Sequence, residues 1–200
     1  MLRSLVGSEM CIRDRFNVAR FASQFDMPEV EPTSTFPVED RWIRSEFSAT
    51  MKVVESSWQN LDIYTATQAL KTFGTGILPS HWLEMAKTRL YDGDIHAAWT
   101  IHSILKDFLA AFSPVCPFFC HHISMTLYGE SSVDVDQFPL QGAIDEDLNC
   151  LTPEIEAFNS EVWKTKKEQG LSLNAEIEGI VIPQTLEEFN GTLSRMHKLL

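Results

Sequence analysis

Several features that would point away from an ordinary globular domain are scarce or missing in this sequence. No apolar run reaches the ~18 residues that a membrane-spanning helix needs, so no transmembrane segment is predicted. Four cysteines in 200 residues are too few and too irregularly spaced for a disulfide framework, which favours a reducing, cytoplasmic compartment. Positive charge is also scarce, because 16 Lys and Arg stand against 28 Asp and Glu, a net charge of −12. Since nucleic-acid-binding proteins usually carry a basic face, that function would here need a local cluster of cations.

Motifs for catalysis or metal binding are also scarce. The sequence Phe-Gly-Thr-Gly at residues 73–76 lacks the later glycine of a phosphate-binding loop, and no H-E-x-x-H zinc motif occurs. One group has the character of metal ligands, and it consists of Cys116, Cys120, His121 and His122. No second pair follows at the spacing of a zinc site, so packing of a helix in the core is the better interpretation. We predict no catalytic residue and no metal site in this chain.

The N-terminal part of the sequence contains two segments outside any predicted core. Residues 1–15, MLRSLVGSEMCIRDR, lack the hydrophobic stretch of a signal peptide and resemble translated sequencing-adapter sequence. We expect a non-native leader here, followed by a piece of a longer chain cut on its N-terminal side. Residues 16–25 have the apolar spacing of a buried helix, whereas residues 26–39 contain three prolines that forbid one. The second segment is therefore predicted to be a linker.

Apolar spacing predicts a helical bundle over residues 16–129. From Asp40, which we take as an N-cap, apolar residues recur at steps of three or four at Ile43, Phe47, Met51, Val54, Trp58 and Leu61. Further helices are predicted at residues 63–73, 81–90, 95–112 and 118–128. The first two of these flank a disturbed stretch with Gly74, Gly76 and Pro79, where we expect a kink. The helix at residues 95–112 is apolar nearly all round, so it belongs at the centre of the bundle.

Residues 130–200 are predicted to form a smaller C-terminal extension. Residues 132–138 alternate like a strand, and residues 141–150 are acidic and loop-like. Thr152 is placed as the N-cap of a helix that ends before Gly170, and Thr185 with Glu188 forms a capping box for a last helix. Two β-prone pieces flank Gly179. The predicted fold class is mainly α, an antiparallel bundle of five or six helices with a small α+β C-terminal tail.

Two groups of cations stand out as candidates for RNA binding. Arg20, Arg41 and Arg44 flank the linker from both sides, and Trp42 lies between the last two. Arginine beside an exposed aromatic ring supplies the planar donor and stacking surface that unpaired RNA bases need. The alternative is a solvated helix start with Trp42 partly buried. The second group, Lys164, Lys166 and Lys167, is favourable at the end of a helix and could also contact phosphates.

Five segments resemble the anticodon-binding region of class I aminoacyl-tRNA synthetases for valine, leucine and isoleucine. Four of them are NVARF at residues 17–21, DRWI at residues 40–43, HWLEMAKTRLY at residues 81–91 and FSPVCPF at residues 112–118. The fifth, FNSEVWKTKKEQGLSL at residues 158–173, is similar to the FNS-x-x-W-x-x-KK-x-x-G-LSL segment of valyl-tRNA synthetases, particularly of the archaeal type. The resemblance covers residues 16–200.

The resemblance implies a helical bundle that reads the anticodon of tRNA(Val). It implies base contacts by aromatic and polar side chains and phosphate contacts by arginine and lysine. The implied partners are tRNA(Val) and N-terminal catalytic and editing domains, without DNA or membrane, in the cytoplasm. The implied activity is that of a valine–tRNA ligase whose ATP and Mg²⁺ belong to the catalytic domain, with no cofactor in this segment. Two alternatives remain, the same domain of an isoleucine or leucine enzyme and a helical protein-interaction module, which the net charge of −12 favours.

The purified chain is expected to catalyse no valine-dependent exchange of pyrophosphate into ATP. The two signatures with which the resembled family binds ATP, H-I-G-H and K-M-S-K-S, do not occur in the 200 residues. The measurement is an exchange assay with labelled pyrophosphate, with and without valine. Valine-dependent exchange above the enzyme-free control would contradict the prediction.

Overall fold

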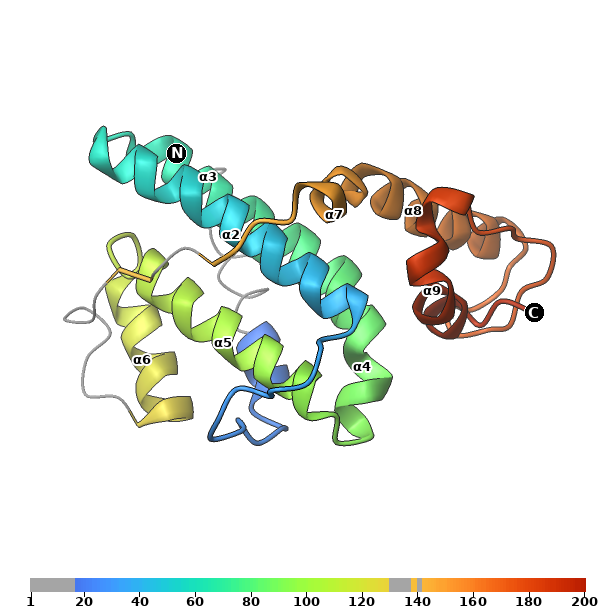
Figure 1. Ribbon diagram of the computed structural model, residues 1–200, viewed down its shortest axis with the longest axis horizontal. Helices are drawn as coiled ribbons and strands as arrows, with labels where there is room; N and C mark the ends of the chain where they lie inside the picture. The colour runs from blue at the N-terminus through green and yellow to red at the C-terminus, as the bar shows by residue number, and fades with distance from the viewer. Residues whose placement is uncertain (1–16, 130–137, 140–141) are drawn as a thin grey trace.

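The fold is a bundle of helices with a smaller helical group at one end (Figure 1). A computed structural model describes residues 17–129, 138–139 and 142–200, so the predicted leader and most of the predicted strand at residues 132–138 lie outside the described residues. A short helix at residues 17–22 comes first. It is followed by α2 (Val38–Gln59), α3 (Ile63–Thr72), η1 (Phe73–Trp82), α4 (Leu83–Tyr91), α5 (Ile95–Phe112), α6 (Pro117–Tyr128), α7 (Glu146–Cys150), α8 (Thr152–Glu168), η3 (Gln184–Phe189) and α9 (Asn190–His197).

The predicted mainly-α class is confirmed. Within the described residues there is no strand, and the β part of the C-terminal tail is reduced to one isolated parallel bridge between Ile177 and Leu199. None of the helices described is long and apolar enough to cross a membrane.

The long helix α2 buries the stripe that its spacing predicts. Ile43, Phe47, Met51 and Val54 are all buried, and the helix packs against α3 and α5. The prediction that Leu61 continues the stripe is wrong, because this side chain is 84% exposed. The helix has already ended, and Leu61 has a left-handed backbone with φ of 58° in the turn to α3.

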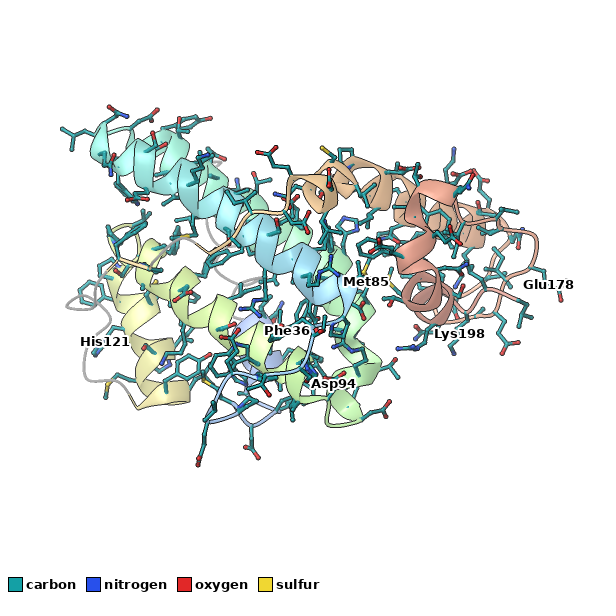
Figure 2. All side chains as sticks on the ribbon, in the orientation of Figure 1. Phe36, Met85, Asp94, His121, Glu178 and Lys198 are labelled. Atoms are coloured by element: carbon teal, nitrogen blue, oxygen red, sulfur yellow. The ribbon has the colours of Figure 1, made fainter. Side chains whose placement is uncertain are left out.

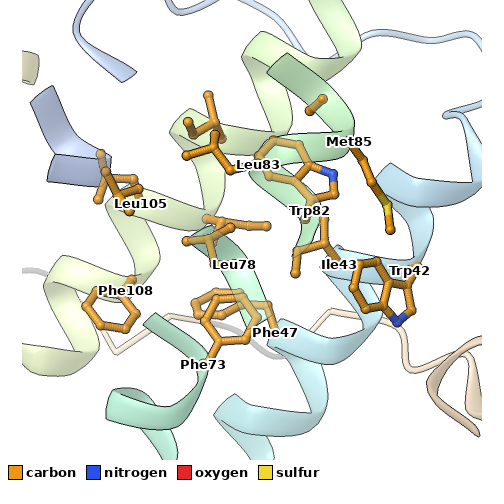
Figure 3. Close-up of a cluster of buried hydrophobic side chains, with 14 of the residues drawn as sticks. Trp42, Ile43, Phe47, Phe73, Leu78, Trp82, Leu83, Met85, Leu105 and Phe108 are labelled. Atoms are coloured by element: carbon orange, nitrogen blue, oxygen red, sulfur yellow. The ribbon is translucent and has the colours of Figure 1, made fainter. Parts of the chain in front are cut away.

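Helix α5 lies at the centre of the bundle, as its all-round apolar pattern predicts. It contacts α2, α4 and α6. The carboxylate of Asp94 caps its start by accepting hydrogen bonds from the backbone N–H groups of His96 and Ala97. Gly93, with φ of 79°, makes the tight turn from α4 that only glycine adopts without strain. Figure 3 shows the core that results, where Phe47 and Phe73 lie with ring centroids 5.1 Å apart.

The disturbed stretch between α3 and α4 remains helical. Its ten residues form the π-helix η1, a wider coil in which each N–H reaches five residues back instead of four. The expected kink at Gly74, Gly76 and Pro79 is therefore a widened segment, with no break between α3 and α4. Gly74 also has a packing role, because a Cβ at this position would lie 2.8 Å from two ring atoms of Phe108. The missing side chain lets η1 approach α5 closely.

The C-terminal elements fold back onto the bundle. Helix α7 contacts α2, α8 contacts η1, and α9 contacts α4 (Figure 1). Part of the predicted loop at residues 141–150 is helical, since Asp145 caps α7 by accepting from the backbone N–H of Leu148. The capping box is wrong, because the Thr185 hydroxyl donates to the Glu154 carboxylate and a short 3₁₀ helix precedes α9. The predicted boundary near residue 129 stays a prediction.

Replacing Leu105 by alanine is expected to lower the free energy of unfolding by about 2–5 kcal/mol, because the side chain of Leu105 is only 4% exposed and its loss leaves a cavity. Urea denaturation followed by circular dichroism measures the change. Val181→Ala is the control, since Val181 is 86% exposed and should change stability by less than about 0.5 kcal/mol. A Leu105→Ala effect as small as that of the control would place Leu105 outside the core.

Candidate nucleic-acid interface

The start of α2 is fixed by a buried carboxylate. Asp40 is not the N-cap, because α2 begins at Val38 and the side chain of Asp40 is completely buried. Its two oxygens accept hydrogen bonds from Arg89, at 2.6 and 3.1 Å, and from the indole N–H of Trp82, at 3.0 Å. Burial raises the pKa of Asp40, although the guanidinium of Arg89 opposes the shift.

Arg89 joins three helices at this point. Beyond Asp40, its guanidinium donates to Glu39, at 2.8 Å, and to Asp94, the N-cap of α5, also at 2.8 Å. Burial by itself would lower the pKa of Arg89, but the hydrogen bonds and charge of these carboxylates raise it above its ordinary value. The Arg89 junction therefore locks the start of α2 and the start of α5 to the end of α4.

Trp42 faces the interior, next to this junction. It is completely buried, and its indole N–H donates to the hydroxyl of Thr152, at 2.8 Å. The same hydroxyl donates to Glu46, so Thr152 does not cap α8 as its sequence predicts. The prediction that Trp42 offers a stacking surface to RNA is wrong, because the indole packs edge-on against Phe189.

The linker at residues 26–37 lies over the starts of α2 and α5. At its beginning, His102 donates to the backbone carbonyl of Phe25, at 2.9 Å. At its end, Phe36 packs edge-on against His96 with 5.1 Å between ring centroids. Arg44 completes this packing, because its guanidinium lies 4.3 Å from the centre of the Phe36 ring and pairs with Glu31 at 2.5 Å. Figure 2 shows Phe36 and Asp94 close together at this end of the bundle.

An exposed tyrosine extends the same surface toward the N-terminal helix. Tyr91 is 63% exposed, and its ring packs edge-on against Phe21 and Phe25, with centroids 6.0 and 5.4 Å away. Arg20, the residue before Phe21, is exposed. We call the surface along the linker, made of Arg20, Phe36, Arg44, Tyr91 and His96, the linker face.

Sequence reasoning missed three of these residues. Tyr91 is the last residue of the HWLEMAKTRLY segment. Because it directly follows Leu90, which is buried, the sequence did carry a signal that the ring of Tyr91 is exposed. Phe36 and His96 carried no such signal, since their contact joins residues far apart in the sequence. Arg41 belongs to another part of the surface, 3.7 Å from Asp145, and half of its side chain is exposed.

The lysines of α8 divide into two groups. Lys164 and Lys167 are exposed, and Lys164 lies 3.9 Å from Glu168. Lys166 is completely buried, and its ammonium group donates to the backbone carbonyls of Leu173, at 2.9 Å, and His197, at 2.7 Å. Burial lowers the pKa of Lys166. The prediction that Lys166 contacts phosphate is therefore wrong.

A buried amide group, that of Asn159, organises the packing of the FNSEVWKTKKEQGLSL segment. The side chain of Asn159 is completely buried, donates to Nδ1 of His81, at 2.9 Å, and accepts from Nε2 of His197, at 2.7 Å. Burial lowers the pKa of both histidines, that of His197 to about 4, so both rings are neutral at pH 7. The centroid of the Trp163 ring lies 5.8 Å from the centroid of each of the two imidazole rings. This Asn159 network, together with Lys166, holds α8 against η1 and α9.

Among the described residues, no three His, Cys, Asp or Glu side chains come together as metal ligands. Cys120, from the group with the character of metal ligands, is buried in the core.

Comparison with known proteins gives one family and a consistent set of relatives. Residues 40–182 match the anticodon-binding domain of tRNA ligases. The sequence is 28% identical over 196 residues to the valine–tRNA ligase of Aeropyrum pernix, covering 92% of the chain and 24% of that relative. It is 26% identical to the valine–tRNA ligases of Saccharolobus solfataricus, over 175 residues, and Mycolicibacterium paratuberculosis, over 161 residues, covering 86% and 78% of the chain. The chain spans only 21% and 18% of the lengths of these two relatives.

Replacing Arg89 by methionine is expected to destabilise the protein by about 3–5 kcal/mol, because Asp40 and Glu39 would be left buried without a counter-charge. Urea denaturation at pH 7 measures the change. Lys87→Met is the matched control in the same helix, since the Lys87–Glu84 pair is partly exposed and worth at most about 1 kcal/mol. Equal effects of the two variants would show that the Arg89 junction does not hold the helices together.

Proposed function

Because the chain belongs to the family of anticodon-binding domains of tRNA ligases, we propose that it binds the anticodon arm of tRNA(Val). The valine specificity rests on the relatives, since those compared above are valine–tRNA ligases from three organisms. The proposed role is recognition without chemistry. Phosphate contacts orient the RNA, and contacts to unpaired bases identify it.

The observation that carries the proposal is the composition of the linker face. In a chain with a net charge of −12, this surface combines one exposed ring, that of Tyr91, and two partly buried rings, those of Phe36 and His96, with two arginines. Tyr91 presents a ring that is 63% exposed, and the guanidinium of Arg44 already stacks on Phe36. Unpaired bases bind to such platforms, where aromatic rings and guanidinium planes stack on them and the arginines also neutralise the backbone.

The cations fall into two proposed roles. In this proposal Arg20 and Arg44, the two arginines of the linker face, contact bases and adjacent phosphates. Arg41 and Lys164 are exposed elsewhere on the surface and supply phosphate contacts further along the anticodon stem, whereas the exposed Lys167 supplies a phosphate contact at the loop. A phosphate at Arg44 competes with Glu31, whose carboxylate pairs with the guanidinium in the free protein.

The wider activity follows from the relatives and is also a proposal. We infer that the chain serves a valine–tRNA ligase, which joins valine to tRNA(Val) at the expense of ATP with Mg²⁺ in its catalytic domain, in the cytoplasm. The catalytic and editing domains of that enzyme are then its protein partners. The segment itself supplies no group for that chemistry and needs no cofactor to bind RNA.

Arg20→Ala and Tyr91→Ala are each expected to weaken binding of a tRNA(Val) anticodon stem-loop by about 1–3 kcal/mol, through loss of a base or stacking contact. Lys167→Ala should instead weaken all stem-loops equally and reduce the dependence of affinity on salt, because it loses one phosphate contact. Fluorescence anisotropy with labelled stem-loops across a salt series measures both effects.

Lys52→Ala, at an exposed position on α2, is the control and should bind like the unmodified chain. Stem-loops of tRNA(Ile) and duplex DNA test the specificity. Equal binding of the tRNA(Val) stem-loop and of duplex DNA, or full affinity in both the Arg20 and Tyr91 variants, would contradict the proposed function at this surface.

A further inference from the structure

A groove of about 830 Å³ opens beside the linker face. Its walls come from parts of the chain that are distant in sequence, namely the helix at residues 17–22, η1, α4, α8, the loop after α8, and α9. Three of the segments that carry the family resemblance, residues 17–21, 81–91 and 158–173, all contribute to it. Phe21 lines the groove and also packs against Tyr91, so the groove and the linker face adjoin at this ring.

The lining has the chemistry of a nucleobase site. Phe21 and Trp163 supply aromatic rings, and Asn17 and Asn174 supply amides that can both donate to and accept from a base edge. Ser80 adds a hydroxyl group. The volume lies within the range of about 300–1,000 Å³ that is usual for small-molecule sites, and this range accommodates a nucleotide. Stacking combined with hydrogen bonds to base edges is how proteins hold unpaired RNA bases.

The charge of the groove favours a base over a cluster of phosphates. Lys87 lines the groove, but Glu84 lies beside it and pairs with its ammonium group at 2.6 Å. One further cation, Lys167, follows Trp163 by four residues, which places both on the same face of α8. Among the residues that the structure describes, the site therefore offers polar and aromatic groups with Lys167 as a cation at its edge, enough for a single nucleotide and its phosphate.

The wall around Trp163 is built from buried polar contacts. His81 and His197 flank the indole, and the amide of Asn159 fixes both imidazoles. Lys166 holds the backbone carbonyl of Leu173, the residue directly before Asn174. Burial of a lysine against backbone carbonyls costs free energy. An apolar side chain would fill the same space at a lower cost if packing were its whole role. The arrangement fixes the position of the indole and of the Asn174 loop, as a site for a specific ligand requires.

We propose that this groove binds one unpaired nucleotide of the anticodon loop, next to the nucleotides on the linker face. The inference rests on the proposed function and adds a subsite to it. Trp163 and Phe21 stack on the base, Asn17 and Asn174 contact its edge, and Lys167 contacts its phosphate. The groove then selects among tRNAs by the identity of this base.

The test uses the full chain and tRNA(Val) anticodon stem-loops that carry 2-aminopurine at one loop position at a time. At one position the fluorescence of 2-aminopurine should be quenched on binding, because the base stacks on the indole. Asn174→Ala should weaken binding of the unlabelled stem-loop by about tenfold, the loss of one hydrogen bond to a base, without changing the salt dependence. Asn60→Ala, an exposed asparagine at the end of α2, is the matched control and should bind normally.

The outcomes separate the subsite from the proposed function. If the unmodified chain binds no stem-loop, the proposed function fails and the subsite fails with it. If the stem-loop binds in a Tyr91-dependent way, but Asn17→Ala and Asn174→Ala both keep full affinity, the groove has another occupant and only the subsite proposal is overturned. Trp163→Leu serves as a second variant, with circular dichroism to verify its fold, and should abolish the quenching at the one position.

Discussion

The bidentate hydrogen bond between Arg89 and Asp40 is the constraint on which the arrangement of the bundle depends. One guanidinium binds Asp40, Glu39 and Asp94, which begin α2 and α5, from the last turn of α4. Such a buried ionic group adds little net stability compared with apolar packing. However, any arrangement of the helices that leaves one of these buried charges without its partner is strongly destabilised. The ionic group thereby fixes how α2 is rotated about its axis, and that rotation turns Trp42 inward while Arg41 remains exposed.

A second polar network controls the C-terminal part of the chain. Asn159 joins η1 to α9 through two histidines, and Lys166 ties the loop after α8 to the end of α9. The first network supports the linker face and the second supports the wall of the groove beside it. The two surfaces meet at Phe21, which lines the groove and packs against Tyr91, so the proposed RNA-binding surface extends over both networks.

The elements that sequence reasoning predicted correctly are those that local physics determines. The stripe of α2 and the all-round apolar α5 depend on residues close together in the sequence. The errors concern polar side chains whose partners are distant. Asp40 has the right residue type for an N-cap, but Arg89, 49 residues away, binds it instead. Trp42 finds its partner 110 residues later, and Lys166 finds one in the carbonyl of His197, so neither is available to RNA. Of the site, sequence therefore predicted the exposed cations but not the rings beside them.

The most direct test of the account is to locate the anticodon loop on the protein. Stem-loops of tRNA(Val) with 4-thiouridine at single loop positions can be crosslinked to the full chain by light, and the crosslinked peptides identified by mass spectrometry. Crosslinks are expected at Tyr91, Phe36 and the residues around Phe21. Tyr64, which is 74% exposed at the far end of the α2–α3 pair, is an internal standard for a tyrosine outside the site and should remain unmodified. Crosslinks confined to Tyr64 and its neighbours, with none on the linker face, would contradict the account.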